Sequence, residues 1–282
     1  MHILQAIIMG IVQGLSEFLP ISSSAHLVIT SNLYKVLKDI PLHQESSQEI
    51  FLDIMLHVGT LIAVLIYFRK DISEITVSFF KALKTRDFSS TNAKLSLYIL
   101  LGTIITIIIA FPLHTIAEDL VFAPAIVGFL LILTGFLLLG SEQYSKKIVN
   151  KSNTIDLKTS IIMGIFQGLA ALPGFSRSGL TISSGLLNKR DRITAARYSF
   201  LLSIPIIIGA SLMYPLIKID LHEFINFNWP AIISGTVISA IVGYLCIKYF
   251  LKFLEKYSLA FFGYYCIIIG VVTFIFFSIF AK

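Results

Sequence analysis

Long apolar stretches alternate with short polar segments along the whole chain, and six of them are long enough to cross a membrane. A membrane-spanning helix needs about 20 predominantly apolar residues. The six stretches cover residues 51–68, 95–113, 121–140, 198–217, 230–249 and 259–280. Two further stretches, 3–34 and 160–188, each contain two short apolar pieces around a polar segment with a proline and serines. Because irregular backbone at membrane depth must be enclosed by protein or line a wet cavity, both are predicted to be re-entrant helical hairpins.

The two predicted hairpins begin with nearly the same nonapeptide. Residues 7–15 read IIMGIVQGL and residues 161–169 read IIMGIFQGL, so eight of nine positions are identical after an offset of 154. Each copy continues into a polar segment, which we call the first elbow (residues 16–26) and the second elbow (residues 170–181). Broken apolar segments at corresponding places in two halves of a chain point to a binding site between repeats.

The basic loops predict how the two halves are oriented. Seventeen of the 22 Lys and Arg residues lie in four loops, at 69–94, 141–158, 189–197 and 248–256. Only four lie in the alternate loops and at the C-terminus. Since basic loops face the cytoplasm, this pattern fits six crossings with both termini outside, and neither hairpin crosses. Three crossings in each half make the second repeat (151–282) inverted relative to the first (1–150), within one membrane domain.

Composition supports an all-α polytopic membrane protein. Hydrophobic residues make up 56% of the chain and charged residues 13%, with a mean hydropathy of +0.87, whereas soluble domains carry about 25% charged residues. The net charge of +6 is explained by the cytoplasmic loops, so nucleic acid is not an expected partner. Cys246 and Cys266 lie in apolar runs and are expected to be packed thiols. The oligomeric state is open, a homo-oligomer included.

Three Asp, Glu, Lys or Arg residues remain once those of the loops and the C-terminus are set aside: Glu17, Asp53 and Arg177. Such groups are costly in a membrane and are functional candidates. Glu17 and Arg177 occupy the two elbows, so we expect them to pair, either for chemistry or as a structural lock between the hairpins. Asp53 begins a predicted span, where an interfacial acid without a functional role is also common.

Hydroxyl and glycine residues around these charges form a predicted phosphate site. A free helix N-terminus binds anions through its N–H groups, and Arg adds a planar fork for phosphate. Serine before a helix also serves as a simple N-cap, and some of these residues are expected to do only that. The candidates for substrate binding are Ser22, Ser24, Gly174, Ser176, Ser178 and Thr181.

Ser23 and His26 are the candidate nucleophiles. They lie three residues apart, so their side chains can share one helix face, and a neutral imidazole can activate a serine or attack phosphorus itself. Glu17 can orient the histidine, accept a proton or bind a divalent cation. The alternative for His26 is a core histidine bonded to backbone. Gln13 and Gln167, which correspond in the repeat, are support candidates that can also bond across the hairpins.

The two elbows carry a family resemblance. Residues 13–26, QGLSEFLPISSSAH, resemble the (E/Q)xxxE signature and serine-rich stretch of the bacterial undecaprenyl-diphosphatase family, BacA (UppP). Residues 173–181, PGFSRSGLT, are similar to its PGxSRSxxT signature. The resemblance covers essentially the whole chain. Gln13 stands where many members have Glu, and Ala25 where Gly is common.

The resemblance implies hydrolysis of undecaprenyl diphosphate, assisted by Mg²⁺ or Ca²⁺, at a site open to the outer face of the bacterial cell membrane. It also implies recycling of the lipid carrier for cell-wall polymers and bacitracin resistance. Glu17 would be the acid/base or cation-organising residue, with Gln13 beside it, and Arg177 the diphosphate clamp. Two alternatives stay open at this point: an inverted-repeat transporter or lipid flippase for a phosphate-bearing substrate, and a structural membrane scaffold.

Overall fold

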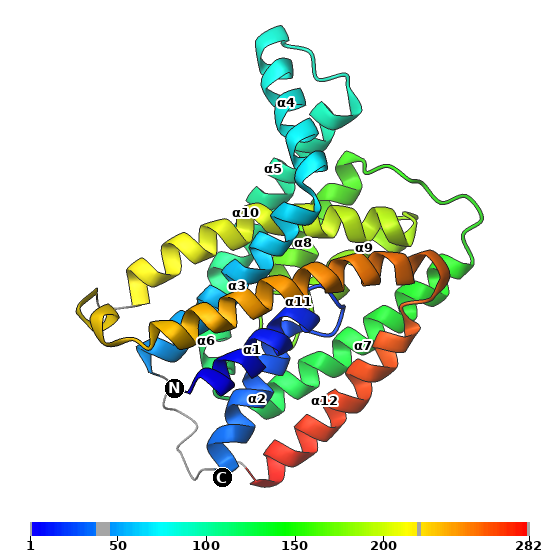
Figure 1. Cartoon of the computed structure of the whole chain (residues 1–282). Coiled ribbons are helices and arrows are strands. Elements are labelled where there is room, and N and C mark those ends of the chain that lie inside the picture. Colours follow the sequence, from blue (N-terminus) through cyan, green and yellow to red (C-terminus); the bar gives the residue numbers. More distant parts are fainter. Residues whose placement is uncertain (1, 38–45, 219–220, 281–282) are drawn as a thin grey trace.

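The computed structural model describes residues 2–37, 46–218 and 221–280, and these residues form helices without a β-strand (Figure 1). Among them, six helices are long and apolar enough to cross a membrane. They are α3 (Ser47–Tyr67), α5 (Thr91–Ala110), α7 (Pro124–Lys146), α10 (Arg192–Lys218), α11 (Trp229–Lys256) and α12 (Ala260–Phe280). The prediction of an all-α, multi-pass membrane protein is therefore confirmed, and each of the six predicted spans falls on one of these helices.

Two pairs of shorter helices occupy the stretches predicted to be hairpins. The first pair is α1 (Ile3–Ser16) and α2 (Ser23–Leu37), and the second is α8 (Leu157–Leu169) and α9 (Arg177–Leu187). Each helix of 11 to 15 residues is shorter than the roughly 20 residues that a bilayer requires. The helix breaks lie in the two elbows, as predicted. Re-entry from opposite sides and the inverted repeat stay predictions.

Corresponding glycines let the two pairs pack closely on equivalent spans. A Cβ added to Gly10 of α1 would lie 2.5 Å from the carbonyl oxygen of Gly235 in α11, and one added to Gly164 of α8 would lie 2.7 Å from that of Gly102 in α5. Close approach through small residues is how membrane helices gain packing area. The repeated nonapeptide thus places each short helix directly against a span, α1 on α11 and α8 on α5.

A cluster of aromatic side chains anchors the first elbow. Phe18, which follows Glu17 in the chain, is fully buried and meets the Phe200 ring edge-on at a centroid distance of 5.3 Å. Phe200 also contacts the rings of Phe68 and Phe250, each at 6.2 Å. Edge-to-face aromatic pairs add directional attraction to apolar burial. Because its neighbour is anchored in this way, the backbone at Glu17 is held in place.

The segment 69–94, which was predicted to be a loop, contains a further helix. Residues Arg69–Thr85 form α4, which projects from one end of the bundle (Figure 1). Ile75 and Ala82 are buried on one face of it, and α4 packs against α5. The difference arises because apolar residues at helical spacing give α4 a packing face despite its many charges. Shorter helical turns complete the connections: Phe111–Leu113 (η1), His114–Leu120 (α6) and Leu221–Asn226 (η2).

Candidate active site

The two elbows meet, and three contacts join them. Arg177 Nη2 donates to Glu17 Oε1 at 2.7 Å, Ser178 Oγ donates to the carbonyl oxygen of Leu19 at 2.9 Å, and Ser22 Oγ donates to that of Phe175 at 3.2 Å. The predicted pairing of Glu17 with Arg177 is therefore confirmed. Two helices, α2 and α9, begin at this meeting point.

Local backbone geometry explains why both helices begin there. Ser22 has φ +68°, and its Oγ accepts the N–H of Ala25 at 3.2 Å, which makes it the N-cap of α2. Ser176 caps α9 in the same way, accepting the N–H of Gly179 at 3.0 Å. Gly174 has φ +105° and lies against the backbone of α7, where a side chain would be strained and crowded. Ser22 and Ser176 are thus N-caps, one of the two roles foreseen for the serines.

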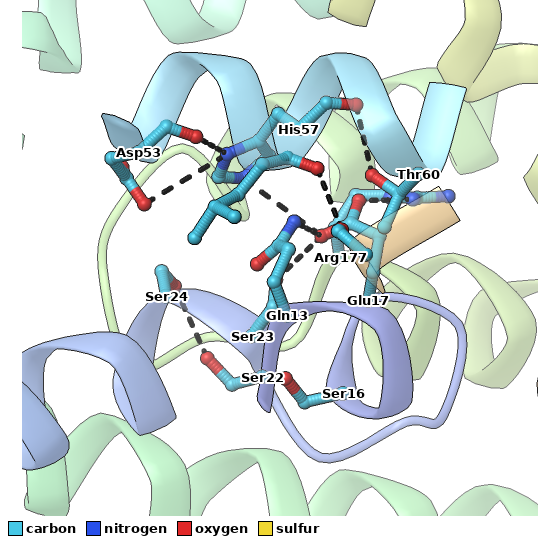
Figure 2. A network of polar contacts seen from close by, with 12 residues as sticks. Gln13, Ser16, Glu17, Ser22, Ser23, Ser24, Asp53, His57, Thr60 and Arg177 are labelled. Atoms are coloured by element: carbon cyan, nitrogen blue, oxygen red, sulfur yellow. Dashed lines mark hydrogen bonds and ion pairs between the residues drawn. The ribbon is translucent and has the colours of Figure 1, made fainter. Parts of the chain in front are cut away.

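Glu17 is the centre of a polar network, although only 7% of its surface is exposed. Besides the ion pair with Arg177, its Oε2 accepts a 2.6 Å hydrogen bond from Ser23 Oγ and a 3.0 Å bond from Gln13 Nε2. Figure 2 shows these groups converging from α1, α2 and α9. Buried carboxylates are stable only when paired and hydrogen-bonded. This network holds Glu17 Oε2 within hydrogen-bond distance of the Ser23 hydroxyl, a position from which a carboxylate can accept a proton.

Asp53 and His57 of α3 complete the opposite side of the site (Figure 2). His57 Nε2 lies 3.9 Å from Glu17 Oε2, and its Nδ1 lies 2.8 Å from the backbone oxygen of Asp53. The side chains of His57 and Asp53 are 30% and 52% exposed, so both face open space beside the buried Glu17. In the sequence, the spacing of His57 four residues after Asp53 is only a weak signal for a role at the site.

His26 does not join Ser23. Its Nδ1 is 2.8 Å from the carbonyl oxygen of Ser22, and its Nε2 is 2.8 Å from the hydroxyl of Tyr265 in α12. Since a carbonyl only accepts, Nδ1 carries the proton and Nε2 accepts from Tyr265. Neither nitrogen is then free to attack phosphorus or to activate a serine. Helical spacing put Ser23 and His26 near one face, but the His26 side chain turns towards α12.

The remaining hydroxyl candidates differ in how open they are. Ser178 and Thr181 are buried, and Thr181 Oγ1 is bonded to the backbone oxygen of Arg177 at 2.7 Å and to Ser199 Oγ at 2.5 Å. Ser24 is partly exposed and lies 3.2 Å from Ser22 Oγ. Gln167 bonds to Thr106 and to the backbone of Leu202, away from Glu17. Ser23, Ser24 and Arg177, each partly exposed, are therefore the open parts of the predicted phosphate site.

The oxygen atoms around Glu17 fit a divalent cation that is shared with substrate. Gln13 Oε1 is buried and has no hydrogen-bond partner among the described residues, and Asp53 offers an exposed carboxylate. Within the described residues, no three His, Cys, Asp or Glu side chains are grouped to hold an ion by themselves. Mg²⁺ is commonly bound by one or two carboxylates together with substrate phosphates and water. Gln13, Glu17 and Asp53 match that arrangement.

Comparison with known proteins identifies the family of the chain. A family model described as bacitracin resistance protein BacA matches residues 6–272. An undecaprenyl-diphosphatase of Halothermothrix orenii is 41% identical over 99% of this chain and 100% of its own length. One of Methanobrevibacter smithii is 41% identical, covering 97% of both chains, and undecaprenyl-diphosphatase 1 of Pseudoalteromonas translucida is 36% identical over 99% and 100%. The chain therefore belongs to the BacA family.

Proposed function

We infer that this chain is an integral-membrane hydrolase that cleaves undecaprenyl diphosphate to undecaprenyl phosphate and inorganic phosphate. The observation that carries this inference is the position of Glu17 between Ser23, at 2.6 Å, and Arg177, at 2.7 Å. A nucleophile, its proton acceptor and a phosphate-binding cation are thereby assembled in one place. Membership of a family whose relatives bear the name undecaprenyl-diphosphatase supports the substrate.

Substrate binding uses charge and helix ends. Arg177 has five N–H donors in a planar fork, and among the described residues only its contacts with Glu17 and with the backbone oxygen of Ser199 use them. The remaining donors are available for phosphate oxygens. Ser23 and Arg177 are the first residues of α2 and α9, so the positive ends of both helix dipoles favour the diphosphate.

The chemistry follows from the 2.6 Å contact of Ser23 with Glu17. Ser23 Oγ attacks the terminal phosphorus as its proton passes to Glu17, and the bond from that phosphorus to the bridging oxygen breaks. Undecaprenyl phosphate leaves, and the terminal phosphoryl group stays covalently bound to Ser23. Water then cleaves the phosphoserine to release inorganic phosphate, and Ser23 regains its proton. Arg177 stabilises the charge on the transferred phosphoryl group, which is the dominant requirement of phosphoryl transfer.

A divalent cation, Mg²⁺ or Ca²⁺, fits this mechanism as a partner of the diphosphate. Gln13 Oε1, Glu17 and Asp53 would hold it. When bound, it supplies neutralisation of phosphate charge and a template for orientation. Gln13 contributes an oxygen ligand without a charge, so the protein's part of the site is weaker than one with two adjacent carboxylates.

The protein acts within the bilayer, where the polyprenyl tail of the substrate resides. We propose that both termini and the opening of the site face outward, because the basic loops select that orientation. Recycling of the lipid carrier for cell-wall polymers, and with it bacitracin resistance, follows from this activity and location.

Phosphate release from undecaprenyl diphosphate by the purified protein tests the proposal. Wild type with Mg²⁺ should release phosphate, and EDTA should suppress the reaction. Ser23→Ala should abolish release, whereas the matched control Ser234→Ala, which loses a hydroxyl bonded to the Pro230 carbonyl oxygen of its own helix, α11, should retain most of it. Full activity of Ser23→Ala would refute the nucleophile. A wild type that binds the lipid without releasing phosphate would instead indicate a carrier.

A further inference from the structure

The hydroxyl of Tyr265 reaches the first elbow from α12, a helix that packs mainly against α7. Its 2.8 Å hydrogen bond to His26 Nε2 is accompanied by ring stacking, with centroids 5.7 Å apart and planes 7° from parallel. The next residue, Cys266, contacts the same elbow through its thiol, 3.4 Å from the carbonyl oxygen of Pro20. Two consecutive residues of α12 therefore hold the elbow.

His26 passes this contact on to the backbone of Ser22. The Ser22 carbonyl oxygen accepts both the His26 Nδ1–H, at 2.8 Å, and the His26 backbone N–H, at 3.2 Å. This carbonyl belongs to the peptide that joins Ser22 to Ser23. The orientation of this peptide plane therefore sets the direction in which the Ser23 side chain leaves the backbone.

The Ser22 turn needs such support. Its φ of +68° is a left-handed conformation that a residue with a side chain adopts at an energetic cost. Positions of this kind persist only where surrounding contacts hold them, and they cluster at functional sites. The carbonyl oxygen of Ser22 is held by His26. Its hydroxyl accepts a hydrogen bond from the backbone N–H of Ala25 and donates one to the carbonyl oxygen of Phe175.

We propose that Tyr265 is a positioning residue, which acts through His26 to hold the Ser22 turn and so aims Ser23 Oγ at Glu17. This proposal rests on the function proposed above and assigns His26 a place in that relay instead of a role in proton transfer. The chain Tyr265–His26–Ser22–Ser23–Glu17 runs through hydrogen bonds and one peptide, and each link is 2.6 to 2.8 Å where it is a side-chain hydrogen bond. It connects α12 of the second half to the candidate nucleophile of the first.

Kinetics of matched variants test the relay. Tyr265→Phe keeps the stacked ring and removes only the hydroxyl, and Tyr264→Phe removes the hydroxyl of the neighbouring, 60% exposed tyrosine. With undecaprenyl diphosphate, Tyr265→Phe should lower kcat about three- to tenfold, the effect of one hydrogen bond, with KM and the melting temperature unchanged. Tyr264→Phe should behave as wild type. Wild-type kcat in Tyr265→Phe would overturn the proposal.

Two histidine variants separate positioning from chemistry. His26→Asn can still donate to the Ser22 carbonyl, as Nδ1 does, so it should retain more activity than His26→Ala. In His26→Ala, adding Tyr265→Phe should cause no further loss, because both act through one path. Independent, multiplicative losses, or His26→Asn as inactive as His26→Ala, would contradict the relay.

A measurement without turnover keeps this proposal distinct from the proposed function. The hydrogen bonds require the neutral His26 tautomer with its proton on Nδ1, which ¹⁵N NMR of histidine-labelled protein identifies. The Nε2 resonance should move in Tyr265→Phe and not in Tyr264→Phe. An Nε2–H tautomer would refute the relay even in an active enzyme. Absence of phosphate release from wild type would refute the function while the NMR result still decides the relay.

Discussion

Glu17 Oε1 accepts a 2.7 Å hydrogen bond from Arg177 Nη2, across a contact between two helix breaks that lie 160 residues apart in the chain. Glu17 uses its other carboxylate oxygen for Ser23. One carboxylate therefore connects the phosphate-binding Arg of the second elbow with the hydroxyl of the first. A purely structural ion pair has no need of the serine, and this shared carboxylate is the feature that favours chemistry.

Replacement of Arg177 by Lys should separate charge from geometry. Lys keeps the positive charge but lacks the planar fork, so it cannot contact Glu17 and two phosphate oxygens together. We expect kcat/KM to fall about 10- to 100-fold, the range for loss of a hydrogen bond to a charged group. Steady-state phosphate release measures this. Equal rates for Arg177→Lys and wild type would show that the fork is not used.

Gln13 provides a test of the cation site. Gln13→Glu places a second carboxylate beside Glu17 and should lower the Mg²⁺ concentration for half-maximal activity by about tenfold, because ligand charge controls affinity. Gln13→Leu removes the unpartnered oxygen and should raise that concentration. Activity is titrated with Mg²⁺ after EDTA treatment. Identical Mg²⁺ dependence in both variants and wild type would exclude Gln13 from the cation site.

Close packing at Gly10 predicts a stability effect outside the site. In Gly10→Ala the new Cβ would lie 2.5 Å from the carbonyl oxygen of Gly235, and such overpacking costs about 1–3 kcal/mol. Gly140→Ala is the matched control, since beyond its chain neighbours and the adjacent backbone of α7 no atom of the described residues lies within 4 Å of its added Cβ. Thermal unfolding in detergent should show a lower melting temperature for Gly10→Ala alone. A normal melting temperature would mean that α1 and α11 are less tightly packed.

The orientation in the membrane is open to labelling. Val149 is 93% exposed in the predicted cytoplasmic loop, and Thr115 lies exposed in α6 on the predicted outer side. Cys246 and Cys266 are buried and give a low background. A membrane-impermeant maleimide should label Thr115→Cys in intact cells and Val149→Cys only after permeabilisation. The reverse pattern would invert the topology.

Much of this architecture could be predicted, because the lengths of the apolar runs and the positions of the charges are visible in the sequence itself. The six spans follow from apolar runs that can only be buried in a bilayer. The meeting of Glu17 with Arg177 follows because they are charges left in two corresponding helix breaks. A helix in the segment after the first span was missed, since the charges of α4 mask the apolar face that holds Ile75 and Ala82.

Side-chain partners within the site were harder to predict. Spacing places Ser23 and His26 near one helix face. It cannot show that the His26 imidazole is hydrogen-bonded to Tyr265, 239 residues further along the chain. His57 reaches Glu17 from α3, a span that carries neither elbow. Ser22 and Thr181 carry the same hydroxyl chemistry as Ser23, and only packing shows that their hydroxyls are used within the protein.

The rate of phosphate release by Glu17→Gln tests the account most directly. Gln has the size of Glu and can still contact Ser23 and Arg177, but it cannot take the proton of Ser23. Because general base catalysis contributes about 10²- to 10⁴-fold, the rate with undecaprenyl diphosphate and Mg²⁺ should fall by that factor while the melting temperature shows a folded protein. A folded Glu17→Gln enzyme with a rate close to wild type would contradict the central role of Glu17.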